Sequence, residues 1–319
     1  MEMKQLEIFA CVSKTLSFSK AAEALYISQP TVSACISALE KELGVQLFIR
    51  NTKEVSLTKA GDELLQYAQK ILSLREQALH SVSGENREAP GFIDIVASTI
   101  PAQHLLPEMI ARFQHDWPNI VFRVDQADSR QVEKEMAGFR YDFGMMGTLP
   151  NSDRLIHAPI YDDELVLVLP KSTKNDVKYS VKEIREGFAE YIRQVPILMR
   201  EAGSGTRTEM EALLSQMGIE AHELRPCAYF SDTQSIVEAV ARGMGVSLVS
   251  KVAAALHVSA GRLQMVEMGS PLFRRQIHLL HHKERWLSPV QAAFADFAAQ
   301  FYHRDAKKGT KKSIKKASE

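Results

Sequence analysis

The chain has 319 residues, of which 45% are hydrophobic, so it can form two or three domains of ordinary size with substantial cores. Lys plus Arg and Asp plus Glu number 39 each, which gives zero formal net charge and excludes a chain-wide field that would attract nucleic acid or an anionic membrane. The three cysteines lie far apart, which excludes a disulfide framework and a zinc finger and favours a reducing compartment, the cytoplasm.

The N-terminal residues predict neither a signal peptide nor a membrane span. Charges at Glu2, Lys4 and Glu7 interrupt the first apolar positions, and no later apolar run is long enough to cross a bilayer. A first helix is expected from about Lys4 to Ser13. A second short helix, around Ala21, has small residues that let its neighbours approach closely.

A third helix is predicted to begin at Gln29, because Ser28 is placed to cap it and Pro30 is tolerated in its first turn. Gly44 ends it. The apolar stripe of this helix consists of Val32, Ile36, Leu39 and Leu43. The opposite face and its shoulders carry Gln29, Pro30, Thr31, Ser33, Ala34, Ser37 and Lys41. A face of small polar residues can enter a DNA major groove without clashing, which indicates a recognition helix. An ordinary surface helix with a solvated face is the alternative.

The next residues predict a small β-hairpin. The runs Gln46–Arg50 and Glu54–Leu57 flank Asn51, Thr52 and Lys53, so that cations lie at the tip. Three helices followed by a basic hairpin form a winged helix-turn-helix. Residues 1–60 are therefore predicted to be an all-α domain with a wing.

The sequence resembles the LysR-type transcriptional regulators over nearly everything but its C-terminal tail. The residues that carry this resemblance are Leu6–Phe9, Ser17–Leu25, Ser28–Ser33, Leu39–Gly44, Leu47–Arg50 and Leu57–Gly61. The resemblance implies a sequence-specific DNA-binding regulator that is switched by a small effector. It also implies that double-stranded DNA is approached by the helix residues Gln29, Pro30, Thr31 and Ser33 and by the wing cations Arg50 and Lys53; the polar face adds Ser37.

Two departures from the family pattern affect DNA binding. Ala34 and Lys53 stand where many members carry Arg, so a base-reading donor and a planar guanidinium are missing. Residues 1–60 hold seven Lys or Arg against six Glu, a net charge of only +1. Because phosphate contacts supply much of the affinity for DNA, one copy of this domain should bind weakly. Specific binding should therefore need a homodimer or homotetramer.

A long amphipathic helix is predicted over 58–85, with Thr58 as its cap. Its apolar stripe consists of Gly61, Leu64, Leu65, Ala68, Ile71, Leu72, Ala78, Leu79 and Val82. Such a stripe needs a cover, either from its own chain or from the same helix of a second subunit. The family resemblance favours the second subunit.

The remaining chain predicts an α/β domain and a tail. A polar Pro-Gly linker ends at Gly91, after which short apolar runs alternate with helical segments. We expect a two-lobed effector domain over 92–303, similar to periplasmic solute-binding proteins, with lobe I formed by 92–164 and 268–303 and lobe II by 165–267. Residues 304–319 carry a net charge of +5 and predict a disordered basic tail.

The effector site is predicted at strand ends and helix starts facing the cleft between these lobes. Ser98 and Thr99 follow one strand, and a glycine-rich turn follows another. The candidate residues of that turn are Gly203, Ser204, Gly205, Thr206 and Arg207. Hydroxyls and amides with little apolar lining favour a small anion, such as a sulfur oxyanion or short carboxylate. A plain capped turn is the alternative, and Arg207 either completes the charge or pairs with Glu201.

Nothing in the sequence predicts catalysis, a metal site or a cofactor. Asp142-Phe143-Gly144 matches a kinase triplet but lacks the accompanying motifs, and the adjacent His281 and His282 would point to opposite faces of a strand. The alternative function is an intracellular small-molecule binding protein or enzyme with an N-terminal assembly module. The helix residues 28–33 and the wing argue against it, because an enzyme has no reason to carry them.

Overall fold

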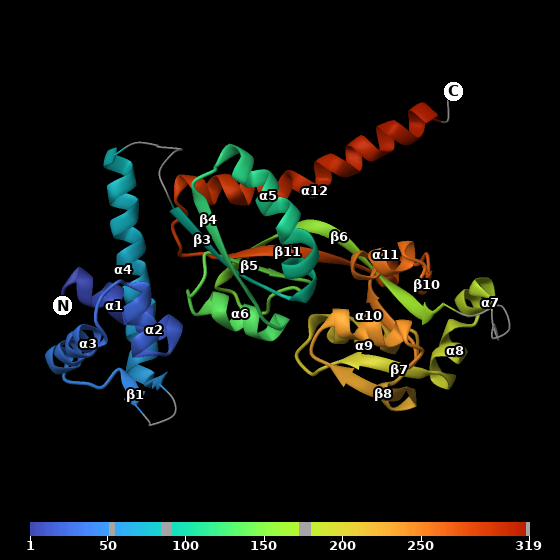
Figure 1. The fold of residues 1–319 in the computed structure, drawn as a ribbon, viewed down its shortest axis with the longest axis horizontal. Coiled ribbons are helices and arrows are strands. Elements are labelled where there is room, and N and C mark those ends of the chain that lie inside the picture. The colour runs from blue at the N-terminus through green and yellow to red at the C-terminus, as the bar shows by residue number, and fades with distance from the viewer. Residues whose placement is uncertain (51–54, 84–90, 172–179, 317–319) are drawn as a thin grey trace. The chain divides into compact units, whose positions relative to one another are not determined.

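The computed structural model describes residues 1–50, 55–83, 91–171 and 180–316. The chain forms two compact units, the first mainly from its N-terminal part and the second mainly from the described residues beyond 90 (Figure 1). The wing tip with Lys53 and the predicted linker at 84–90 lie outside the described residues.

The first unit contains three helices, α1 (Met3–Thr15), α2 (Phe18–Ala24) and α3 (Gln29–Leu43). Polar residues cap the starts of α2 and α3. The Ser17 side chain accepts the N–H of Lys20, and Gly44 ends α3 in the left-handed region at φ 71°. The apolar stripe predicted for the third helix is buried at Val32, Ile36 and Leu39. These side chains pack with α1 and α2 in one core, which fixes the opposite face of α3 outward.

The wing consists of strands β1 (Phe48–Arg50) and β2 (Val55–Leu57), paired antiparallel. The Glu40 carboxylate of α3 accepts the N–H groups of Leu47 at 2.8 Å and Phe48 at 3.2 Å, so the wing is attached to the third helix. Helix α4 (Lys59–Ser83) follows, with the Gly61 N–H bonded to the Thr58 hydroxyl. A Cβ at Gly61 would overlap the Leu47 carbonyl oxygen, so only glycine fits there.

The apolar stripe of α4 divides into two parts. Near its start, Leu65 and Ala68 are buried in the core of α1 to α3, with Leu72 packed partly against it. Farther along, Leu79 is 55% and Val82 89% exposed. Packing on its own chain therefore accounts for the first part of the stripe and leaves the second part uncovered.

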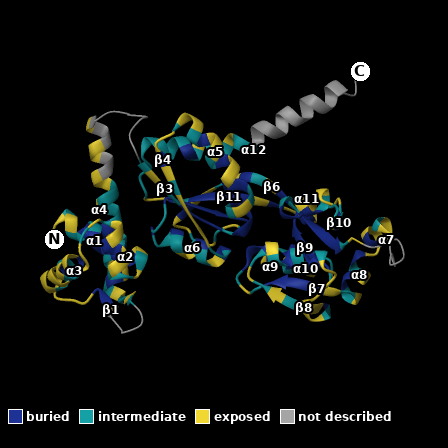
Figure 2. Cartoon of the chain, viewed as in Figure 1, coloured by how far each residue is buried: buried dark blue, intermediate teal, exposed yellow. Residues whose placement is uncertain are grey.

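The second unit is built on a mixed sheet with the strand order β10-β6-β11-β5-β3-β4. The first lobe holds the parallel strands β3 (Gly91–Ala97), β4 (Ile120–Gln126) and β5 (Phe143–Met146), with a π-helical turn η1 (Pro101–Leu105) and helices α5 (Leu106–Asp116) and α6 (Ser129–Ala137). Among these strands, β3 and β5 are mostly buried, whereas Ile120 is the one buried residue of β4 (Figure 2).

One long strand, β6, runs from the first lobe into the second. In β6 (Leu155–Pro170), the residues up to Glu164 pair with β11 (Arg274–His282), and those from Leu165 pair with β9 (Ser247–Ser250). β10 (Leu263–Val266) pairs with the end of β6, and the chain returns to the first lobe through the 3₁₀ turn η3 (Pro271–Phe273). Figure 1 shows β6 extending from one lobe into the other.

The second lobe has its own core, formed around β6, β7 and the helices that follow. Its remaining elements are α7 (Val181–Glu186), α8 (Phe188–Gln194), β7 (Pro196–Arg200), α9 (Gly205–Gln216), η2 (Ala221–Glu223), β8 (Arg225–Phe230), α10 (Thr233–Ala241) and α11 (Lys251–Ser259). β7 and β8 are parallel, and a bridge from Ile197 to Val246 joins β7 to the chain before β9. The helices α9 and α10 therefore begin where β7 and β8 end.

The C-terminal segment differs from the prediction. A disordered tail is expected over 304–319, but helix α12 (Pro289–Lys316) continues through most of it. Lysine and alanine are good helix formers, and extending an existing helix costs far less than starting one. Net charge alone does not reveal this helix propensity. Residues 317–319 lie outside the described residues.

Candidate functional site

The first candidate site is the start of α3. Ser28 accepts the N–H of Thr31 at 3.3 Å, and their hydroxyls lie 2.7 Å apart, which fixes the first turn. Gln29, Pro30 and Thr31 are exposed, as is Ser37, whereas Ser33 is half-buried. The structure therefore leaves Gln29, Pro30, Thr31 and Ser37 exposed on α3, whereas the predicted wing residue Arg50 ends β1 and Lys53 lies outside the described residues.

Tyr26 is a residue of this surface that sequence reasoning missed. Its side chain is 95% exposed, and its backbone adopts φ 55°, an uncommon value for a residue other than glycine. The turn thus holds a phenol beside the start of α3. A hydrophobicity pattern assigns an aromatic residue to the core, so the only available signal was the position of Tyr26 directly before the capped helix.

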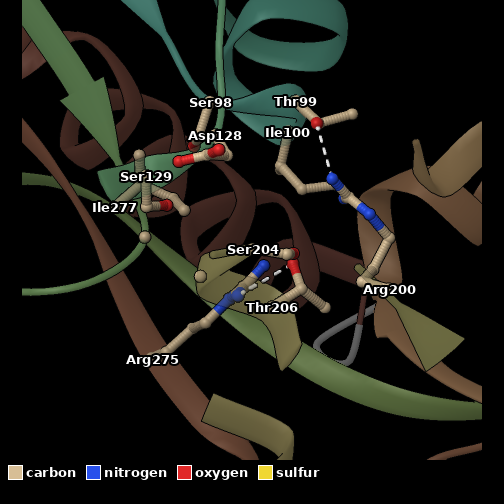
Figure 3. Close-up of a pocket in the computed structure, with 12 residues that line it drawn as sticks. Ser98, Thr99, Ile100, Asp128, Ser129, Arg200, Ser204, Thr206, Arg275 and Ile277 are labelled. Carbon is tan, nitrogen blue, oxygen red and sulfur yellow. Dashed lines mark hydrogen bonds between the residues drawn. The ribbon is translucent and has the colours of Figure 1, made fainter. Parts of the chain in front are cut away.

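The second candidate site is a small pocket, partly open to solvent, between the lobes of the second unit (Figure 3). Its lining residues are Ser98, Thr99, Ile100, Asp128, Ser129, Gly147, Arg200, Ser204, Gly205, Thr206, Arg275 and Ile277. Most of them are polar. They come from strand ends and helix starts, where backbone N–H groups lack intrahelical partners.

Arg200, at the end of β7, brings a buried cation to this pocket. Its guanidinium is held by Glu201 through bonds of 3.1 and 2.9 Å, and it donates to the Thr233 hydroxyl at 3.0 Å. A further bond of 3.4 Å reaches the Thr99 hydroxyl of the first lobe. A guanidinium with this many acceptors is fixed in one orientation.

Arg275, on β11, supplies a second buried cation. It lies opposite Asp163 of β6 and donates Nε to that carboxylate at 2.9 Å, and the side chains are 4% and 1% exposed. Asp163 also accepts the Ser250 hydroxyl at 2.6 Å. Arg275 Nη1 donates to the Thr206 hydroxyl of the second lobe at 3.3 Å. Each arginine therefore bonds a threonine of the opposite lobe.

The structure brings together five of the seven predicted effector residues, Ser98, Thr99, Ser204, Gly205 and Thr206. Gly203 and Arg207 do not line the pocket. The predicted pairing of Arg207 with Glu201 was wrong: the Arg207 guanidinium donates to Glu211 at 2.7 Å, one helical turn along α9, whereas Glu201 pairs with Arg200. The N–H fork of Arg207 reaches the neighbouring turn because residues four apart lie on one helix face.

The starts of α6 and α9 meet at the pocket. A Cβ at Gly205 would overlap the Ser129 hydroxyl, so glycine permits this close approach. Two helix N-termini, each with a partial positive charge, therefore face the same small space. Together with two guanidiniums and several hydroxyls, this arrangement can hold a compact group rich in hydrogen-bond acceptors.

The sequence matches two family models. Residues 3–62 match the bacterial regulatory helix-turn-helix proteins of the lysR family, and residues 86–302 match the LysR substrate binding domain. The chain belongs to the LysR family. It is a LysR-type transcriptional regulator with a helix-turn-helix domain and an effector-binding domain.

Individual LysR-type proteins are similar along most of the chain. The uncharacterized HTH-type transcriptional regulator YeiE of Escherichia coli K12 is 32% identical over 295 residues, which cover 92% of this chain and 96% of that protein. A full-length OxyR variant of Pseudomonas aeruginosa has a TM-score of 0.73 at 20% identity, over 94% of both chains. Full-length CbnR complexed with its target DNA has a TM-score of 0.59 at 20% identity, covering 94% of this chain and 99% of CbnR. The two solved structures support the LysR-type fold.

Within the described residues, no helix has the length and apolar character that would let it cross a membrane. The same part of the chain contains no group of three or more His, Cys, Asp or Glu side chains arranged to hold a metal ion.

Proposed function

We propose that this LysR-type regulator acts in the cytoplasm as an oligomer without catalytic activity. It reads DNA with the exposed start of α3 and the wing, and it is switched by a small anion bound between the lobes of its second unit. The family membership and the similarity to CbnR, which was solved with its target DNA, support the DNA-binding part. The exposure of Gln29, Thr31 and Ser37 on a helix whose apolar stripe is buried supports the assignment of α3.

The single observation that carries the anion proposal is the pair of buried guanidiniums that line one pocket from opposite lobes. The side chains of Arg200 and Arg275 are 5% and 4% exposed, and each is already placed by its own carboxylate partner. A ligand that accepts from both would favour the closed arrangement of the lobes. Only a difference in affinity between open and closed states can then change DNA binding.

Calorimetry of the full-length protein with sulfate, phosphate, acetate and glycolate tests this proposal. Ser98→Ala and Thr206→Val should each weaken the anion that binds by about 1.5–3 kcal/mol, because a hydrogen bond to charge is lost. Thr208→Val is the matched control, since Thr208 lies on the same helix and donates to the Ser204 carbonyl oxygen instead of lining the pocket. Unchanged affinity in both pocket variants would remove this site from consideration.

The oligomer proposal rests on exposed apolar side chains of α4, some in the predicted stripe and some beside it. Tyr67, Leu74 and Val82 are all more than half exposed on a 25-residue helix, at spacings that a paired helix would cover. Leu72 is packed against its own chain, so it is not part of this face.

Replacing Leu74 and Val82 by Glu should dissociate the oligomer. Carboxylates buried without partners between two paired helices destabilise the interface. Lys59→Glu, an exposed change at the other end of α4, should leave the mass unchanged. Light scattering measures the outcome. A wild-type protein that is already monomeric at micromolar concentration would contradict the proposal.

A further inference from the structure

Asp128 is a pocket residue that neither the predicted site nor the anion proposal uses. It precedes α6, and its Oδ1 accepts the N–H of Gln131 at 2.8 Å as a helix cap. The carboxylate also faces the second lobe, where a Cβ at Gly203 would lie 3.3 Å from Oδ2. Asp128 is therefore both a cap and a wall of the pocket, and Figure 3 shows it beside Ser98 and Ser129.

The charges around the pocket do not favour an anion that has hydrogen-bond acceptors but no hydrogen-bond donor. Arg200 and Arg275 are each bonded to a carboxylate, Glu201 and Asp163. These two ion pairs balance, so Asp128 leaves the lining and its bonded partners with one net negative charge. An ionised carboxylate is an acceptor only, so an acceptor atom placed against it is repelled and gains no hydrogen bond.

A ligand with its own proton donor resolves this conflict. Its acceptor oxygens can meet the guanidiniums and helix starts, while one O–H donates to Asp128. Among the described residues, the guanidinium of Arg275 has partners for its Nε and Nη1 N–H groups. A guanidinium has five N–H donors, so Arg275 retains the capacity to bind the ligand's acceptor side.

We infer that Asp128 selects among small anions, favouring those that also carry a hydroxyl or acidic O–H, such as a hydroxy carboxylate or a protonated oxyanion. This inference rests on the proposed function, because it assumes that the pocket binds an anion. A carboxylate that accepts an O–H strengthens the bond by its charge, whereas an anion without a donor leaves the carboxylate unsatisfied. Sites built to hydrogen-bond an O–H strongly reject the analogue that lacks it.

Calorimetry on the full-length protein tests the inference with two matched pairs of probes. Glycolate and acetate differ by one hydroxyl, and hydrogen phosphate, the dianion that predominates at pH 8.5, has the O–H that the equally charged sulfate lacks. In the wild type the donor-bearing member of each pair should bind roughly tenfold to a hundredfold more tightly. In Asp128→Asn this preference should disappear or reverse, because the amide Oδ1 can keep capping α6 while Nδ2 donates to a simple anion.

Asp153→Asn is the matched control, since Asp153 is exposed and outside the pocket. It removes one negative charge from the same lobe and should keep the wild-type preference. Equal affinities within both pairs in the wild type, or an unaltered preference in Asp128→Asn, would overturn the inference while leaving anion binding intact. Absence of binding by all four probes would instead overturn the proposed anion site, and the inference with it.

Discussion

The two candidate sites of this LysR-type regulator are built in opposite ways. The proposed DNA-binding surface lies on one short stretch, mostly the first turn of α3, with exposed side chains whose neighbours in sequence are neighbours in space. The pocket is assembled from segments as far apart as Ser98 and Ile277, and its charged groups are buried. In the first site, helix geometry alone positions the residues; in the second, ion pairs and lobe packing do.

This difference predicts where function and stability are coupled. A surface side chain can be removed at small structural cost, because water replaces its contacts. A buried charge cannot be removed alone, because its partner is left unpaired in a low-dielectric environment. Substitutions in the pocket should therefore destabilise the fold as well as weaken binding, and those on α3 should affect binding only.

The largest expected effect is that of Arg275→Gln. It would leave the Asp163 carboxylate, 1% exposed, without its cation, at a cost of about 3–5 kcal/mol in the free energy of unfolding. Arg207→Gln is the control, since the partly exposed pair with Glu211 should contribute less than about 1 kcal/mol. Urea denaturation measures both. Similar losses in the two variants would contradict the contrast between the sites.

Gln29→Ala should weaken the free energy of binding to the preferred operator by roughly 1–3 kcal/mol and reduce the discrimination between DNA sequences. The reason is that Gln29 is the strongest hydrogen-bonding side chain at the start of α3. Lys53→Ala should instead weaken all DNA sequences alike, as expected for a phosphate contact. Footprinting and thermal unfolding are measured together. Unchanged site discrimination in Gln29→Ala would show that α3 is not the recognition helix.

A smaller effect is expected for Tyr26→Phe. If its exposed phenol donates to a backbone phosphate, the variant should bind every sequence more weakly by about 0.5–1.5 kcal/mol, without any loss of stability. Tyr229→Phe, an exposed tyrosine of β8, is the control. Equal DNA affinity of Tyr26→Phe and the wild type would rule out this contact.

The smallest effect concerns pH. Burial lowers the pKa of His278, and the neighbouring His157 lowers it further, so folding favours the neutral ring. The stability that depends on this ring is present above the ordinary histidine pKa and is lost as the pH falls through the lowered value in the fold. His278→Gln should therefore reduce the loss of stability between pH 7 and pH 5. His115→Gln, at an exposed position, should have no such effect. Equal slopes of the free energy of unfolding against pH in the wild type and both variants would refute the assignment to His278.

The same contrast explains what could be read from the sequence. The start of α3 was predictable at Gln29 because caps, helix periodicity and glycine stops act between near neighbours. The hydroxyls at Ser98 and Thr206 were found because they follow strands, but Arg200 and Arg275 were missed because a strand arginine is ordinarily expected to be exposed. Their burial depends on carboxylates brought by other segments, which no local pattern reveals.

The passage of β6 between the lobes and its pairing with β11 have a consequence for the order in which the protein is completed on the ribosome. β11 lies between β6 and β5 in the sheet, yet it is made after the whole of the second lobe. Until Arg275 emerges, β5 lacks one neighbour and Asp163 lacks its cation. Since domains generally fold as units in the order of synthesis, the helix-turn-helix should form first, the second lobe next and the first lobe last.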